Sequence, residues 1–257
     1  MLAAALAAVV VVAGAAIAAE PVDLLLVLAS DVSRSVDTAK FKLQRDGYMA
    51  ALSDPRVIEV IRSGPHGRIA ICFVEWSGGE EQRVVIDWTL IDGTKAAQNL
   101  VSQLGEAPRS FANFTSISAG IDFSMAQLRR APYESVRQTI DVSGDGTNNS
   151  GRSVIAARDD AVAQGVTING LVILSEQPLE YDPYHTHPVG GLDTYYRENV
   201  VGGPNSFVIV AETFNAFGKA MLNKLIAEIA DAEHPSVRQF ANLSGSPRSG
   251  NTPPAPR

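Results

Sequence analysis

Apolar and polar positions alternate along the chain in blocks that predict a regular succession of strands and helices. Residues 24–29 form an unbroken apolar run, which is typical of a strand buried on both faces. Residues 38–52 follow with apolar side chains at helical spacing. Further strands are predicted at 69–74, 84–88, 138–143, 166–174 and 207–211, and further helices at 57–64, 95–104, 117–128, 153–164 and 214–229. This alternation predicts an α/β fold: a doubly wound, mostly parallel sheet with helices on both faces and one antiparallel edge strand at 84–88.

Both ends of the chain, and one internal stretch, depart from this pattern. Residues 1–19 carry no charged side chain, which predicts a signal peptide or an uncleaved anchor. We therefore expect an exported protein, in a bacterial periplasm or outside the cell, with a membrane role only if the anchor is retained. Residues 20–232 are expected to form the folded domain, interrupted at 175–206 by an excursion rich in Pro, Gly, Tyr and His. The polar, Pro-rich residues 233–257 predict a disordered tail.

Charge and cysteine content narrow the classes of function. The 257 residues carry a formal net charge of −7 and show no Lys/Arg stripe, which argues against a nucleic-acid partner. The single cysteine, Cys72, cannot form an internal disulfide, and its apolar neighbours predict a buried, inert thiol.

Oxygen-bearing side chains follow the first buried strand. Asp31, Ser33 and Ser35 alternate where this strand becomes a loop, so one carboxylate and two hydroxyls can point to one location. A buried carboxylate without a partner is costly, and hard cations prefer oxygen ligands of this kind. The alternative is that Ser35 or Asp37 only caps the following helix.

Two more residues join this group if the predicted sheet forms. Asp145 follows the strand at 138–143, and Thr115 opens the helix before that strand. Ligands of open α/β sheets bind at the carboxyl ends of the strands, where the strand order reverses. If the two strands are neighbours, three hydroxyls and two carboxylates converge. Such a set predicts a magnesium site, with manganese or calcium as alternatives.

The order of these motifs resembles that of von Willebrand factor A-type (VWA) domains over most of residues 22–230. The matching segments are DVSRS, FTSISAGI with Thr115, and DVSGDG with Asp145. The exported start and the segment LDTYYRENVVGGPNSF further resemble an uncharacterised bacterial secreted branch of that family. The resemblance implies a metal-ion-dependent adhesion site, in which Ser33, Ser35 and Thr115 bind the metal directly or through water. Asp31 and Asp145 would act mainly through water.

The chain departs from the commoner pattern of that family in two places. The loop before Thr115 reads SFANF instead of being glycine-rich, and Asp141 introduces a charge into the strand before Asp145. Asp141 alternates with apolar neighbours, so we expect it to be buried and paired, with a partner that the sequence does not identify.

Several other residues leave two interpretations open. A rim for a partner is predicted from residues near the same sheet edge: Glu75, Trp76, Ser77, Phe114, Tyr195 and Tyr196. Glu75 to Ser77 could instead simply begin a hairpin. Tyr181, Tyr184, Tyr195 and Tyr196 could form a recognition surface or pack the excursion onto the sheet. His185 and His187 alternate as zinc ligands can, but an exposed polar loop is the preferred interpretation.

For function, the sequence favours a non-enzymatic module that holds a protein partner through a Glu or Asp of the partner. The alternatives are a metal-dependent hydrolase of a phosphate or ester, and a domain that needs the cation only for stability. A hydrolase would need an acid or base near the metal, and the motifs place only carboxylates and hydroxyls there. No nucleophile elbow is present, and Asn149 stands where a dinucleotide-binding glycine would be needed.

Overall fold

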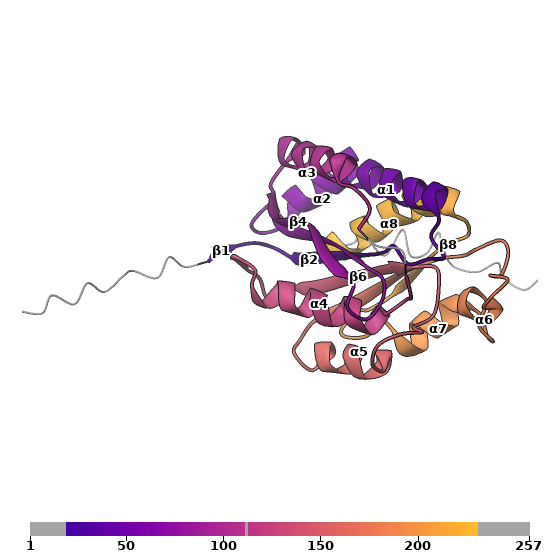
Figure 1. Cartoon of the computed structure of the whole chain (residues 1–257). Coiled ribbons are helices and arrows are strands. Elements are labelled where there is room, and N and C mark those ends of the chain that lie inside the picture. Colours follow the sequence, from indigo (N-terminus) through magenta and orange to yellow (C-terminus); the bar gives the residue numbers. More distant parts are fainter. Residues whose placement is uncertain (1–18, 111–112, 231–257) are drawn as a thin grey trace, which may run out of the picture.

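A six-stranded sheet separates two layers of helices (Figure 1). The computed structural model describes residues 19–110 and 113–230 of the chain. The strands are arranged in the order β4-β3-β2-β6-β7-β8. Their bounds are Leu25–Asp31 for β2, Ile69–Trp76 for β3, Gln82–Ile91 for β4, Gln138–Gly144 for β6, Thr167–Ile173 for β7 and Val208–Ala211 for β8. All neighbours are parallel except β3 and β4, which confirms the predicted antiparallel edge strand.

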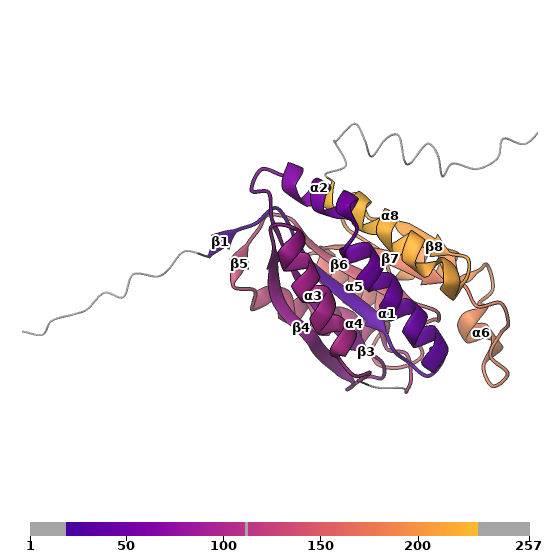
Figure 2. The ribbon, with the colours of Figure 1, turned by 90° about the horizontal axis from the view of Figure 1, so that it is seen from above.

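The helices cover both faces of the sheet (Figures 1 and 2). One face is covered by α1 (Thr38–Leu52), α2 (Pro55–Ser63), α3 (Thr94–Glu106), the 3₁₀ turn η1 (Phe214–Ala216) and α8 (Phe217–Ile229). The other face is covered by α4 (Ile117–Arg129), α5 (Val154–Val162) and α7 (Leu192–Asn199). A separate parallel pair, β1 (Glu20–Pro21) and β5 (Tyr133–Glu134), lies at one end of the molecule. The short helix α6 (Pro183–Thr186) lies at the opposite end.

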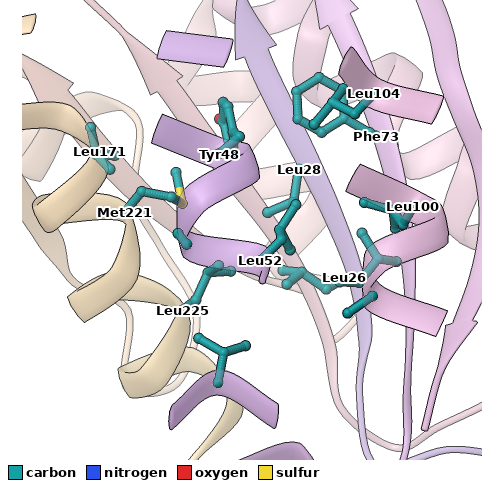
Figure 3. Packing of buried hydrophobic residues seen from close by; sticks show 14 of the residues in the cluster. Leu26, Leu28, Tyr48, Leu52, Phe73, Leu100, Leu104, Leu171, Met221 and Leu225 are labelled. Atoms are coloured by element: carbon teal, nitrogen blue, oxygen red, sulfur yellow. The ribbon is translucent and has the colours of Figure 1, made fainter. Parts of the chain in front are cut away.

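Strand β2 contributes to the hydrophobic clusters on both faces of the sheet, which explains its unbroken apolar sequence. Leu26 and Leu28 pack under α1, α3 and α8 (Figure 3), whereas Leu25 and Val27 belong to the cluster under α4, α5 and α7. Every residue of β2 is buried, including its last, Asp31. Burying this much apolar area on both faces fixes the strand, and therefore fixes where Asp31 ends it.

Helix α1 lies close against α8 at two glycines. A Cβ on Gly47 would stand 2.5 Å from Phe217 Cδ1 and 3.0 Å from Gly218 Cα. A glycine in a helix interior lowers the stability of the helix, so its use at position 47 needs a reason. The close approach of α8, which leaves no room for a side chain on Gly47, provides that reason. The contact holds α1 in place, and with it the loop that joins β2 to α1.

The predicted elements are found within a few residues of their expected positions. The excursion at 175–206 is structured, since it contains α6 and α7. The expected signal segment and the predicted tail lie outside the described residues, apart from the segment's last residue. Within the described part of the chain, no helix combines the length and the apolar character needed to cross a membrane.

Candidate metal-binding site

The strand order of the sheet reverses beside β2. Strand β3 follows β2 in the chain and pairs with one of its edges, whereas β6 pairs with the other edge, placing Ser30 opposite Ser143. Asp31 therefore ends one strand at the point of reversal, and Asp145 directly follows the neighbouring strand. This is the arrangement on which convergence of the candidate ligands depends.

Four of the five candidate ligands are linked by short contacts. Ser33 N donates to Asp31 Oδ1 at 2.7 Å, and the hydroxyl oxygens of Ser33 and Ser35 lie 3.2 Å apart. Ser35 Oγ donates to Asp145 Oδ1 at 2.5 Å. Asp37 caps α1 by accepting a hydrogen bond from a backbone N–H. Ser35 is therefore not needed as a helix cap and is directed to Asp145 instead.

Contacts from other segments fix the backbone of this loop. Arg109 Nη2 donates to Val32 O at 2.7 Å and to Ser33 O at 3.1 Å. Arg34 N donates to Asn113 O at 2.8 Å, which joins the loop to the segment before Thr115. The backbone that carries Ser33 and Ser35 is thus held in position before any ligand binds, which reduces the entropy cost of binding.

The loop after β6 positions Thr115. Thr115 N donates to Asn149 Oδ1 at 2.9 Å, and its carbonyl accepts from Asn149 N at 2.9 Å. The N-cap of α4 is Ser116, whose hydroxyl accepts from Ala119 N at 3.3 Å. Thr115 Oγ1 is thus free of the capping role. Its place is tied to the same loop that carries Asp145.

The site concentrates negative charge in a buried environment. Burial, and then the nearby charge of Asp145, raise the pKa of Asp31 to about 7. Burial also raises the pKa of Asp145, although Ser35 and Lys40 oppose this shift. Among the described residues, Asp31 Oδ2 has no hydrogen-bond partner. A bound cation would offset the repulsion between the two buried carboxylates and would give Asp31 Oδ2 a partner, so the residues fit a hard divalent ion.

The three hydroxyls are essential to this fit. Across residues 19–110 and 113–230, no three His, Cys, Asp or Glu side chains form a metal-binding group. A site at the edge of β2 and β6 would therefore depend on Ser33, Ser35 and Thr115 as much as on its carboxylates. All five side chains are almost fully buried, with at most 6% of any residue exposed.

The structure places an imidazole at this site, which no sequence motif predicts. His185 in α6 is only 4% exposed, and its Nε2 lies 3.2 Å from Thr115 Oγ1. Its Nδ1 lies 3.3 Å from Thr147 Oγ1. Burial lowers the pKa of His185. The expectation of an exposed loop is therefore wrong for His185, although His187 is exposed.

Comparison with protein families assigns the chain to a family. Residues 21–233 match the family described as "Protein of unknown function (DUF1194)". The chain belongs to this family. No curated protein matches it.

Solved structures confirm that this DUF1194 chain has the VWA fold. Proximal thread matrix protein 1 from the mussel byssus aligns with a TM-score of 0.57 and 12% identity, covering 81% of this chain and 47% of that one. A von Willebrand factor type A protein from Catenulispora acidiphila aligns with a TM-score of 0.56 and 12% identity, covering 81% of this chain and 43% of that one. For the pilus adhesin SpaC from Lactobacillus rhamnosus GG the TM-score is 0.55 and the identity 13%, with 82% of this chain and 31% of the adhesin covered. Another structure of the mussel protein is described as having a zinc-occupied MIDAS motif. It aligns with a TM-score of 0.53 and 16% identity, covering 82% of this chain and 47% of that one. This chain thus spans less than half of each of these solved chains.

Four of the six predicted rim residues in the DUF1194 chain are buried by the fold, Glu75 and Trp76 among them. Glu75 forms a buried ion pair with Arg45, and its Oε2 accepts from Ser110 N at 2.9 Å. Trp76 is fully buried against Gly120 of α4, where a Cβ would meet Trp76 Cγ at 2.9 Å. Both side chains serve packing and loop anchoring, so neither can contact a partner directly.

Ser77 and Tyr196 are buried for different reasons. Ser77 Oγ donates to Phe114 O at 3.0 Å and accepts from Asn113 N at 2.9 Å, which fixes the segment before Thr115. The hydroxyl of Tyr196 lies over Gly144, where a Cβ would stand 2.5 Å from it and 3.0 Å from Asp31 Oδ2. Burial and the charge of Asp31 raise the pKa of Tyr196. These residues support the site from inside and do not form its rim.

Exposed aromatic side chains precede two residues of the site. Phe114, directly before Thr115, is 60% exposed, and Tyr184, directly before His185, is 70% exposed. Tyr181 is 62% exposed, and the guanidinium of Arg34 lies 5.2 Å from its ring centre. Tyr195 is half-buried, with its hydroxyl accepting from the backbone of the loop after Asp145. The tyrosines thus divide between the two interpretations. Tyr181 and Tyr184 are exposed and available for recognition, whereas Tyr196 is buried and packs the excursion onto the sheet.

Proposed function

We propose that this protein is an exported VWA-type binding module that uses a divalent cation to hold a protein partner. The cation would be held by the site residues Asp31, Ser33, Ser35, Thr115 and Asp145. The observation that carries this proposal is the linked set of hydroxyls and carboxylates around Asp31, whose Oδ2 lacks a hydrogen bond among the described residues. Magnesium is the first candidate because the set consists of oxygens, with manganese and calcium as alternatives.

The residues would have distinct roles toward the ion. The hydroxyls of Ser33, Ser35 and Thr115 would bind directly or through water, and the two carboxylates mainly through water. Because hydroxyls are neutral, the bound ion would retain much of its charge and attract an anion. An acidic side chain of a partner is the ligand we propose to complete the shell. The adhesin and the zinc-occupied MIDAS structure among the similar folds are consistent with this use.

The exposed aromatics near the site support a protein partner. Phe114, Tyr181 and Tyr184, with Arg34 beside them, combine the residue types that are enriched at protein interfaces. We propose that they form the partner-binding rim together with Tyr195. The uncharged N-terminal segment favours export, so the partner would be periplasmic or extracellular.

Metal titration of the full chain tests the first half of this proposal. Calorimetry of the metal-free protein should show about one magnesium or manganese ion bound per chain. Ser33→Ala and Thr115→Ala should each weaken binding of the ion. The control Ser63→Ala, which changes an exposed serine at the end of α2, should not. Absence of binding by magnesium, manganese and calcium would refute the site.

Affinity capture tests the second half. Partners recovered from the exporting cell by the full chain should be lost in EDTA and with Asp145→Ala. They should also be lost when the contacting acidic residue of the partner is neutralised. Capture that is unchanged in EDTA would contradict a metal-mediated contact.

A metal-dependent hydrolase is a second candidate, and one observation favours it. The sequence motifs place no His or Lys at the site, but in the structure His185 contacts Thr115, and Lys40 Nζ lies 3.5 Å from Asp145 Oδ2. These groups could act as acid or base beside a metal. Turnover of a p-nitrophenyl phosphate or ester with magnesium, lost in His185→Ala, would establish hydrolysis. EDTA-induced unfolding would instead favour the third alternative, a purely structural ion.

A further inference from the structure

We propose that His185 is a nitrogen ligand to the cation, supplied by this chain's own excursion. This inference rests on the proposed metal site and adds an imidazole to its oxygen set. The neighbouring histidine, His187, has no such role, because its side chain is exposed and its Nδ1 contacts Thr186 Oγ1 at 2.9 Å.

The spacing of the donors supports shared coordination. His185 Nε2 lies 3.2 Å from Thr115 Oγ1, and the hydroxyl oxygens of Ser33 and Ser35 are also 3.2 Å apart. Neighbouring ligands of an octahedral ion with bonds of about 2.1 Å lie roughly 3 Å apart. Each pair therefore has the separation expected of two adjacent ligands of an octahedral ion.

The surrounding chain is shaped to receive this imidazole. Gly146, next to Asp145, leaves the space that the ring fills, since a Cβ there would stand 2.1 Å from His185 Nε2. Thr147 N donates to His185 O at 2.9 Å, which joins α6 to the loop after β6. The other ring nitrogen, Nδ1, lies 3.3 Å from Thr147 Oγ1, a contact that orients the ring as outer hydrogen-bond partners of metal ligands do.

A nitrogen ligand has two consequences for the site. Imidazole suits zinc, cobalt and nickel, whereas a site of oxygens alone suits magnesium and calcium. The wild-type protein should therefore bind zinc and cobalt more tightly than an oxygen-only site would. His185 would also occupy a coordination position beside Thr115 that an incoming carboxylate could otherwise take. A partner would then have to displace α6 from the site.

Metal preference separates a ligand from a histidine that only packs against Thr115. Metal-free full-length wild type, His185→Ala, His185→Gln and the control His187→Ala would be titrated with zinc and magnesium by calorimetry. Cobalt binding would be followed by visible absorption. Loss of His185 should weaken zinc binding at least about tenfold. It should also change the cobalt spectrum and leave magnesium affinity nearly unchanged, whereas His187→Ala should match wild type.

The outcomes distinguish this inference from the proposed function. If the His185 variants bind zinc and cobalt as the wild type does, the ligand role is wrong although the metal site stands. If wild type binds none of these ions, both proposals fail. His185→Gln retains a polar side chain in the same space, so it gives a decisive result should His185→Ala prove unstable in thermal melting.

Discussion

The ammonium group of Lys224 lies 2.9 Å from Asp141 Oδ1, and both side chains are fully buried between β6 and α8. Lys224 also pairs with Glu228, one turn further along α8, and Asn169 Nδ2 donates to Glu228 Oε1 at 2.9 Å. Two carboxylates thus share one cation. Burial, and then the charge of Glu228, raise the pKa of Asp141 to about 7. This network accounts for the charged residue within the otherwise apolar strand β6.

Removing the positive charge of Lys224 should lower the stability of the fold far more than neutralising Asp141 does. Lys224→Met leaves two buried carboxylates without a counter-ion and should lower the free energy of unfolding by about 3–5 kcal/mol. Asp141→Asn leaves Lys224 paired with Glu228 and should cost little at pH 8, or stabilise the fold. Urea denaturation measures both, with the exposed Lys219→Met as the control on the same helix. Equal effects of Lys224→Met and Lys219→Met would contradict the role of the network.

The same network predicts a dependence of stability on pH. A carboxyl whose pKa is higher in the folded than in the unfolded protein binds more protons when folded, so its contribution falls as pH rises. For Asp141 this loss extends from about pH 4, near the ordinary aspartate pKa of 3.8, to about pH 7. We expect the free energy of unfolding of the wild type to fall relative to Asp141→Asn across that window and to run parallel above it. A constant difference between the two proteins across the same window would show that Asp141 does not titrate as described.

The sequence predicts the fold well because the decisive signals are local. The apolar run of β2 reflects burial on two faces, and the glycine pair at 78–79 marks the turn into β4. The convergence of Asp31 with Asp145 follows from a general rule about parallel sheets, once β2 and β6 are neighbours. The choice of candidate ligands needed only strand ends, one helix start and residue types.

Features that depend on long-range packing could not be predicted. His185 reaches Thr115 across 70 positions of sequence, through an excursion without clear periodicity. Strand β3 continues through Trp76, beyond the apolar run at 69–74 that predicts it, so Glu75 and Trp76 lie buried within the strand and the expectation of a rim position is wrong for both. Lys224, the partner of Asp141, belongs to a helix near the end of the described chain, and no local pattern around Asp141 indicates that this helix packs against β6.

Neutralising Asp31 should separate metal binding from folding. Asp31→Asn retains an oxygen that can accept from Ser33 N, but it removes the repulsion between Asp31 and Asp145. We expect the metal-free variant to be more stable than wild type by about 1–2 kcal/mol, because the buried charge is lost. Magnesium should raise the melting temperature of wild type but not of this variant. An Asp31→Asn protein that is unfolded without metal would instead support a structural role for the site.

Filling the space beside Asp145 should displace the imidazole without removing it. In Gly146→Ala the new methyl group would stand 2.1 Å from His185 Nε2, so the ring must rotate away from Thr115. The φ angle of Gly146 lies outside the left-handed region, so alanine adds no backbone strain there. We expect weaker zinc binding and an altered cobalt spectrum, as in His185→Ala, with a melting temperature close to that of wild type. Gly93→Ala is the matched control, because a Cβ at that position meets nothing within 4 Å. If Gly146→Ala keeps wild-type zinc affinity and cobalt absorption, the space beside Asp145 does not serve to seat a metal ligand.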